Sequence, residues 1–209
     1  MVKYFEGITG YTPITQHKYF PALNGVKGMT IIMVVITLCL PNSMALFFMY
    51  LFHMPLFLAM SGFLLKASAF ENGAANYAKK LGQRLLIPWA IASILYIPFH
   101  EHYGHTGFGL ANLIYPFYHL WYIPAYIIGS AICYCIHKYK APILPIILGL
   151  ALVTVAWYLV YRDTMVPVKQ LPAFWMGEKR FYGYLFFFVT GYGLRNGLIN
   201  FRPSFYGMA

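Results

Sequence analysis

The chain has 209 residues, of which 60% are hydrophobic and 10% are charged, and its formal net charge is +10. A soluble domain has roughly 25% charged residues, so this composition, with a mean hydropathy of +0.61, does not suit a water-soluble surface. The basic residues fall between apolar runs rather than in one contiguous patch. This pattern argues against nucleic-acid binding and favours a helical protein that crosses a membrane several times.

Six apolar runs approach the length of about 17 to 25 residues that a helix needs to cross a bilayer. They predict an all-α, polytopic membrane protein that forms a single transmembrane domain over residues 1–209. Residues 1–25 are expected to be a cytoplasmic N-terminal segment, residues 26–199 the helical bundle, and residues 200–209 a tail. The expected spans are residues 26–40, 45–65, 85–99, 111–136, 142–161 and 181–199.

The Lys and Arg residues predict how this bundle is oriented. Eleven of the 15 fall on one side of the six spans and four on the other. The positive-inside rule places the richer side, with both termini, in the cytoplasm and the loops 41–44 and 100–109 outside. The second loop contains His100, Glu101, His102 and His105, but their spacing matches no standard metal site, so no metal is expected.

The run 50–66 contains residues that a lipid-facing helix would not need. A histidine at membrane depth is costly, so His53 is expected to face a protein interior or a wet cavity. Pro55 frees a backbone carbonyl one turn earlier and bends the helix locally. Gly62, next to Ser61, allows another helix to approach closely.

The expected fourth span is the most polar. At 100° per residue, five polar side chains fall on one helix face, and Trp121 lies beside them. Such a face suits either hydrogen bonds between helices or a cavity for a polyhydroxyl acceptor and for proton-transfer groups. The five residues are Tyr115, His119, Tyr122, Tyr126 and Ser130.

A basic segment precedes the third span. Residues 77–84 read YAKKLGQR and are expected to form a helical stub at the cytoplasmic surface. Its cations either anchor the chain to anionic lipid headgroups or form a binding site for the phosphate groups of a cytoplasmic donor. In the second case Lys80 and Arg84 would converge with Lys27 at the start of the first span.

Several motifs, taken in order, resemble the integral-membrane acyltransferase 3 family, and most closely its fucose 4-O-acetylase-like subgroup. Each motif is apolar with one or two polar residues, but their order and spacing are more specific, and they cover most of the chain. They are Asn24-Gly25-Val26-Lys27-Gly28, Phe52-His53-Met54-Pro55-Leu56-Phe57 with Ser61-Gly62-Phe63-Leu64, Arg84-Leu85-Leu86-Ile87-Pro88, His119-Leu120-Trp121-Tyr122, and Phe186-Phe187-Phe188-Val189-Thr190-Gly191-Tyr192.

The resemblance implies a membrane-bound O-acyltransferase of a bacterial cytoplasmic (inner) membrane. Such enzymes move an acyl group, typically acetyl from cytoplasmic acetyl-CoA, to a sugar hydroxyl of a surface or lipid-linked glycan. The family typically has about ten helices, so this chain with about six resembles its N-terminal half. The chain differs from the family pattern at one position of the first span. Family members usually have a basic residue at the start of this span and a histidine eleven positions later. Lys27 fills the first position, but Leu38 fills the second and cannot act as a base.

Three functions are therefore compared. The first is an O-acetyltransferase. In this function the phosphates of acetyl-CoA are bound by Lys27, Lys80 and Arg84, and the base is His119 or His53. Its substrate-binding residues would be Tyr115, Trp121, Tyr122, Tyr126 and Ser61. In the second, a shortened, non-catalytic relative binds a glycan or lipid-linked precursor, or serves as a partner subunit. In the third, the polar face of span four is the path of a small transporter. The expected partners are membrane lipid, a glycan or lipid-linked sugar, and a second copy or a subunit that supplies further helices.

Overall fold

The computed structural model describes residues 21–39, 44–96, 120–160 and 179–199, together with Pro98 and Pro116. Every regular element in these ranges is helical, which confirms the predicted all-α class. None of the helices in the described part of the chain combines the length and the apolar character needed to cross a membrane.

Two predicted spans agree with the observed helices to within one residue, because Pro, Asn or Lys residues bound both apolar runs. These are residues 45–65, observed as α3, and residues 142–161, observed as α8. The elements are α2 (Pro21–Cys39), α3 (Met44–Leu64), a 3₁₀ turn η1 (Ala67–Phe70), α4 (Gly73–Leu81), a π-helical segment η2 (Gly82–Leu86), α5 (Ile87–Tyr96), α7 (Tyr122–Tyr139), α8 (Ile143–Val160), α9 (Lys179–Gly183) and α10 (Leu185–Arg195).

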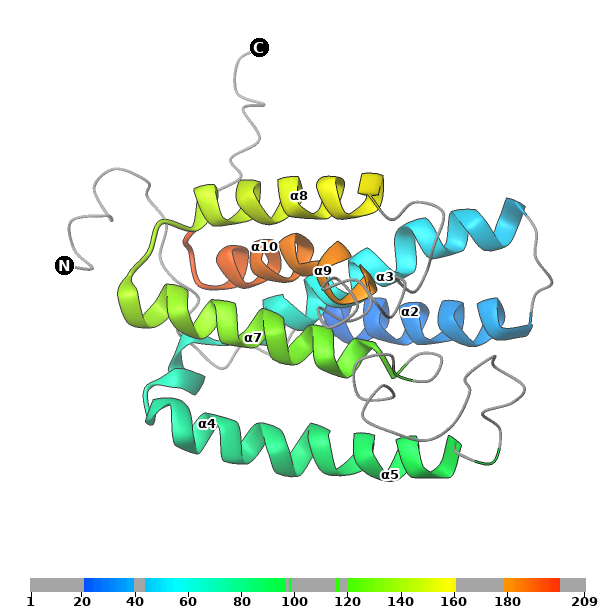
Figure 1. Ribbon diagram of the computed structural model, residues 1–209, viewed down its shortest axis with the longest axis horizontal. Helices are drawn as coiled ribbons and strands as arrows, with labels where there is room; N and C mark the ends of the chain where they lie inside the picture. The colour runs from blue at the N-terminus through cyan, green and yellow to red at the C-terminus, as the bar shows by residue number, and fades with distance from the viewer. Residues whose placement is uncertain are drawn as a thin grey trace, which may run out of the picture.

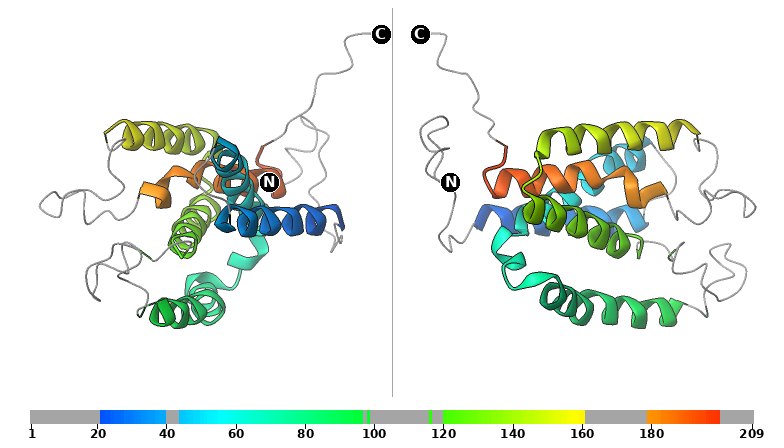
Figure 2. Two further views of the ribbon diagram at one scale, coloured as in Figure 1. Left: turned by 90° about the vertical axis from the view of Figure 1, so that its right-hand side faces the viewer. Right: turned by 60° about the vertical axis from the view of Figure 1, so that its left-hand side comes forward.

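Helix α10 is the element around which the others pack. It lies against α3 over most of its length and also contacts α7 and α8. Figure 1 shows α8 on one side of this bundle and the continuous α4–α5 rod on the other. The two further views in Figure 2 agree, and they show α2 reaching out beside α3.

Glycines on both helices allow the close crossing of α3 and α10. A Cβ atom added to Gly62 would lie 2.7 Å from the carbonyl carbon of Phe188, and one added to Gly191 would lie 2.9 Å from the backbone nitrogen of Phe63. Real Cβ atoms essentially never approach other atoms so closely. The prediction that Gly62 allows a second helix to approach is confirmed, and that helix is α10.

The third predicted span begins earlier than expected. Instead of starting near residue 85, α5 continues from α4 through the π-helical segment η2. Pro88 explains the π turn, since it has no N–H to donate to the carbonyl of Arg84 and its ring would collide with that carbonyl. Widening the turn, with the Ile87 N–H bonded to the Gly82 carbonyl, lets the helix continue past the proline.

The fourth and sixth predicted spans also need correction. Helix α7 begins at Tyr122, after a turn at residues 120–121, and ends at Tyr139, so of the predicted polar face Tyr122, Tyr126 and Ser130 lie on this helix. The sixth span is interrupted at Tyr184 between α9 and α10. There the Thr154 hydroxyl on α8 shares its proton between the Leu150 carbonyl, at 2.9 Å, and the Tyr182 carbonyl, at 3.2 Å, so a neighbouring helix provides a partial donor at the interruption.

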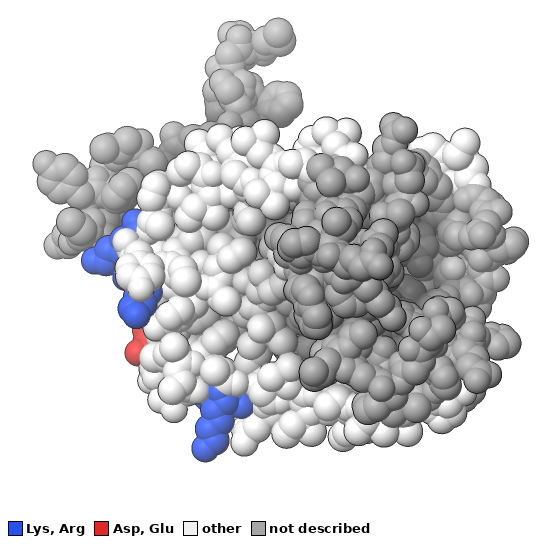
Figure 3. Space-filling view, viewed as in Figure 1, with Lys and Arg blue, Asp and Glu red and all other residues white. Residues whose placement is uncertain are grey.

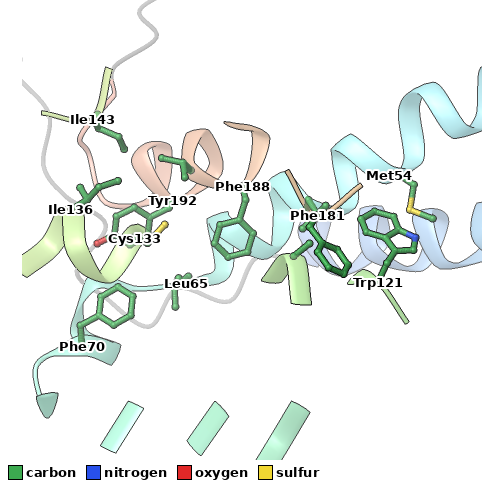
Figure 4. Close-up of a cluster of buried hydrophobic side chains, with 13 residues drawn as sticks. Met54, Leu65, Phe70, Trp121, Cys133, Ile136, Ile143, Phe181, Phe188 and Tyr192 are labelled. Carbon is green, nitrogen blue, oxygen red and sulfur yellow. The ribbon is translucent and has the colours of Figure 1, made fainter. Parts of the chain in front are cut away.

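The buried apolar core runs along the bundle axis. Figure 4 shows it as a row of side chains from Phe70 and Ile136 at one end to Trp121 and Met54 at the other. Phe188 on α10 lies in the middle of this row and is fully buried. The core therefore packs α3, α7 and α10 into one unit. A cavity lies between this unit and the α4–α5 rod.

Candidate functional site

A cavity of about 450 Å³ lies between the α4–η2 segment and helix α7. The structure places Lys80 and Arg84 on one wall and Tyr122 and Tyr126 on the other. Four residues predicted to bind a donor or an acceptor therefore line one space, here called the Arg84 cavity. Ala69, Tyr77, Leu81 and Leu85 complete its lining.

The wall formed by Tyr122 and Tyr126, here called the tyrosine wall, is hydrogen-bonded to a serine from a third helix. The Ser61 hydroxyl donates to the Phe57 carbonyl at 2.8 Å and is hydrogen-bonded to the Tyr122 hydroxyl at 2.5 Å. Since Ser61 has a single hydroxyl proton, Tyr122 is the donor in the second bond. The Tyr122 oxygen thus keeps its acceptor lone pairs, and its ring packs against Phe57 with 4.8 Å between centroids.

Tyr77 is the lining residue that sequence reasoning did not single out. Its buried hydroxyl lies near the hydroxyls of Tyr126 and Ser130 but makes no hydrogen bond within the described part of the chain. Burial raises the pKa of Tyr77, and the two neighbouring hydroxyls partly oppose this shift. Helical spacing could have revealed it, because Tyr77, Lys80 and Arg84 are three and seven residues apart and share one face.

The described cations gather at one end of the molecule. Figure 3 shows Lys and Arg side chains along one edge of the surface, with a broad uncharged surface beyond them. They come from the ends of α3, α4, α7 and α10 and from η2. Among the described residues the only acidic side chain is Glu71. The Arg84 cavity opens within this positive region, which favours an anionic ligand.

His53 is fully buried on α3, as its cost in an apolar run predicted. Its Nδ1 lies 2.5 Å from the Met49 carbonyl oxygen, so Nδ1 carries the proton that is donated there. His53 does not line the Arg84 cavity.

The other predicted site residues are placed differently or fall outside the described ranges. Trp121 is 1% exposed and belongs to the core, 5.6 Å from the ring of Tyr184, rather than to the cavity wall. Lys27 lies in α2, and its side chain is outside the description, as are Tyr115 and His119. Among the described residues no group of three or more His, Cys, Asp or Glu could hold a metal ion.

The fold and the site define a helical-bundle protein with a cavity that carries two cations and three tyrosines, which suits an anionic ligand and a hydroxyl-rich one. The chain belongs to the acyltransferase 3 family, because residues 20–206 match the family model described as an acyltransferase domain. No curated protein and no solved structure matches the chain.

Proposed function

We propose that this protein is a membrane-embedded O-acyltransferase that moves an acetyl or other acyl group from acyl-CoA to a sugar hydroxyl of a surface or lipid-linked glycan. One observation carries this proposal. In a chain of an acyltransferase family, the Arg84 cavity brings Lys80 and Arg84 opposite Tyr122 and Tyr126. Such a transfer requires cations that bind the phosphates of the donor and groups, such as phenols, that bind the sugar.

The donor would bind through its phosphates at the positive end of the cavity. Arg84 is the main candidate, because its planar guanidinium can bind a phosphate through two parallel hydrogen bonds. Lys80 lies one helical turn earlier on the same face and adds a second positive charge. Tyr77 keeps its proton at neutral pH, since burial raises its pKa, and so remains able to donate to a phosphate oxygen.

The acceptor would bind at the tyrosine wall. Tyr122, which gives its proton to Ser61, presents an oxygen that can accept a hydrogen bond from a sugar hydroxyl. The rings of Tyr122 and Tyr126 lie 6.3 Å apart and offer apolar faces on which a sugar ring can stack. In the transfer, the sugar oxygen bonds to the acyl carbon, the C–S bond breaks with release of coenzyme A, and a base takes the hydroxyl proton. His119 and His53 are the candidate bases.

The membrane context of this proposal is supported by the apolar outer surfaces of the helices. Large hydrophobic side chains are exposed along α2, α5 and α8, including Met29 at 67%, Leu95 at 67% and Leu152 at 71%. An apolar surface of this extent is rare on a soluble monomer. The positive-inside rule would then place the end with the described cations in the cytoplasm, where acyl-CoA is found.

The test is release of coenzyme A by purified protein given acetyl-CoA and a panel of glycans. Arg84→Ala should raise the KM for acetyl-CoA by about 10- to 100-fold, the factor expected for one charge-assisted phosphate contact. Lys79→Ala is the matched control, because Lys79 is an exposed neighbouring cation that does not line the cavity, and its KM should stay unchanged. An unchanged KM in Arg84→Ala would remove the donor site from the proposal.

A second function is favoured by a single residue. Leu38 stands eleven positions after Lys27, where the family usually has a histidine, so the usual base is missing. The alternative is a non-catalytic acyltransferase-like protein that binds a glycan or lipid-linked precursor, or that joins a second copy or a partner subunit. Folded protein that binds coenzyme A or glycan but never releases coenzyme A from acetyl-CoA would support this alternative.

A further inference from the structure

A second cavity, of about 450 Å³, lies on the outer side of the bundle between α7 and α8. Its walls are almost entirely aliphatic, with Ile128, Ala131 and Cys135 from α7 and Ile146 from α8. It shares no lining residue with the Arg84 cavity. Here it is called the α7–α8 groove.

One end of the groove is positively charged. Tyr139 and Ala141 line this end, and Lys140 lies between them in the chain. Lys138 adds a second cation, with its Nζ 5.3 Å from the centroid of the Tyr139 ring. Exposed leucines of α8, such as Leu148 at 58%, follow Ile146 in the chain and add to the apolar surface of this helix. The groove is thus apolar along its length and cationic at one end.

The backbone conformation of Lys140 is an independent indication that this lysine has a functional role. Lys140 ends α7 in the left-handed conformation, with φ of 50°, and it is the only non-glycine residue with a positive φ in the described part of the chain. Glycine is the usual residue at this position of a helix C-terminus, because a side chain there is strained. A lysine is present at this strained position, next in the chain to the groove residues Tyr139 and Ala141.

We propose that the α7–α8 groove binds one anionic phospholipid of the surrounding membrane, with an acyl chain in the groove and the phosphate at Lys138 and Lys140. An apolar slot with positive charge at one end matches a molecule that joins a hydrocarbon chain to an anionic head. The site is separate from the proposed catalytic cavity, so it would act by holding α7 against α8.

The test compares phosphatidylglycerol with phosphatidylcholine, each added to the purified full chain in detergent, by native mass spectrometry and by the shift in melting temperature. Phosphatidylglycerol should bind more tightly and stabilise the protein more. Each lysine near an anionic head should contribute about fivefold in affinity, so Lys138→Gln combined with Lys140→Gly should weaken binding by about 25-fold. Soluble glycerol phosphate, which has the head without the chain, should neither bind nor stabilise.

The variants are chosen so that a loss of lipid binding can be distinguished from a loss of folding. Glycine at position 140 adopts the left-handed conformation without strain, so Lys140→Gly should keep or raise the melting temperature without lipid. Lys79→Gln removes one exposed cation away from the groove and should leave lipid binding unchanged. Ala131→Phe should fill the groove and block the chain, whereas Ala156→Phe, at an exposed alanine of α8 outside the groove, should not.

Three results would overturn the proposal. The first is equal stabilisation by the two lipids, and the second is phosphatidylglycerol binding that survives the double lysine variant. The third is a delipidated dimer that Ala131→Phe dissociates, which would assign the groove to a second copy of the chain. None of these measurements uses acetyl-CoA, so failure here is distinct from failure of the proposed acyl transfer.

Discussion

The crossing of α3 and α10 offers the most direct test of the fold, through the substitution Gly62→Ala. The added Cβ would lie 2.7 Å from the Phe188 carbonyl carbon and 3.1 Å from its Cα, whereas ordinary contacts begin at 3.4 Å. The Phe188 carbonyl oxygen is closer still, and all three obstructing atoms belong to the backbone, so no rotamer change can relieve the clash. The two helices must therefore move apart by about 1 Å, and a gap of that size loses a quarter to a half of the dispersion energy of the contacts it opens.

The expected cost can be estimated from overpacking in other cores. Such substitutions cost about 1–3 kcal/mol, and the backbone clash places Gly62→Ala at the upper end of that range. Replacing a helical glycine with alanine also gains about 1 kcal/mol of helix propensity. Gly149→Ala on α8 is the matched control, because a Cβ there meets nothing within 4 Å and only the gain applies. The two variants should therefore differ by about 3 kcal/mol in the free energy of unfolding.

The assay is thermal unfolding of the purified variants in one detergent. A difference of about 3 kcal/mol corresponds to about 6–12 °C for a chain of this size, with Gly62→Ala the less stable variant. Gly191→Ala should behave like Gly62→Ala, because its Cβ would lie 2.9 Å from the carbonyl carbon of Ala59 across the same crossing. Equal melting temperatures for Gly62→Ala and Gly149→Ala would refute the reasoning and the helix crossing itself.

Two further predictions concern orientation and catalysis. A single cysteine at Thr106 should react with an impermeant reagent outside intact cells, and one at Ala74 should not, because the positive-inside rule predicts a cytoplasmic location for residues 67–83. The reverse pattern would invert the predicted orientation. Turnover of acetyl-CoA should fall by about 10²–10⁴-fold in His119→Ala and less in His53→Ala, since a general base contributes that factor; loss of turnover only in His53→Ala would reverse the assignment.

The parts of the fold that sequence reasoning found are those with local causes. The ends of α3 and the start of α8 follow from Pro, Asn and Lys residues that bound apolar runs, and Gly62 indicated a close helix neighbour. The interruption at Tyr184 has only a weak local signal, the preceding Gly183, because the segment FYGYLFFF is otherwise aromatic or apolar and contains no proline. It depends on contacts from α8, where Thr154 bonds the Tyr182 carbonyl and Tyr158 packs against Gly183.

The same distinction applies to the candidate site. Helical spacing brought Tyr122 and Tyr126 to one face, and the basic segment indicated Lys80 and Arg84, but only packing could show that these two groups face each other. Trp121 was expected beside the tyrosines because it precedes them directly in the chain. It lies in the turn before α7 instead, where its large ring is used to fill the core.

The positions of the histidines relative to the Arg84 cavity bear on how transfer could occur. Phe57 packs on Tyr122, a lining residue of the cavity, and His53 lies one helical turn before Phe57 on α3. His119 precedes Tyr122 by three residues and so also comes before the cavity wall in the chain. In the proposed transfer the donor and acceptor groups would share the Arg84 cavity, whose lining includes Lys80 and Arg84 as well as Tyr122 and Tyr126. His53 could take the hydroxyl proton there only after side chains move, because it is fully buried and does not line that cavity.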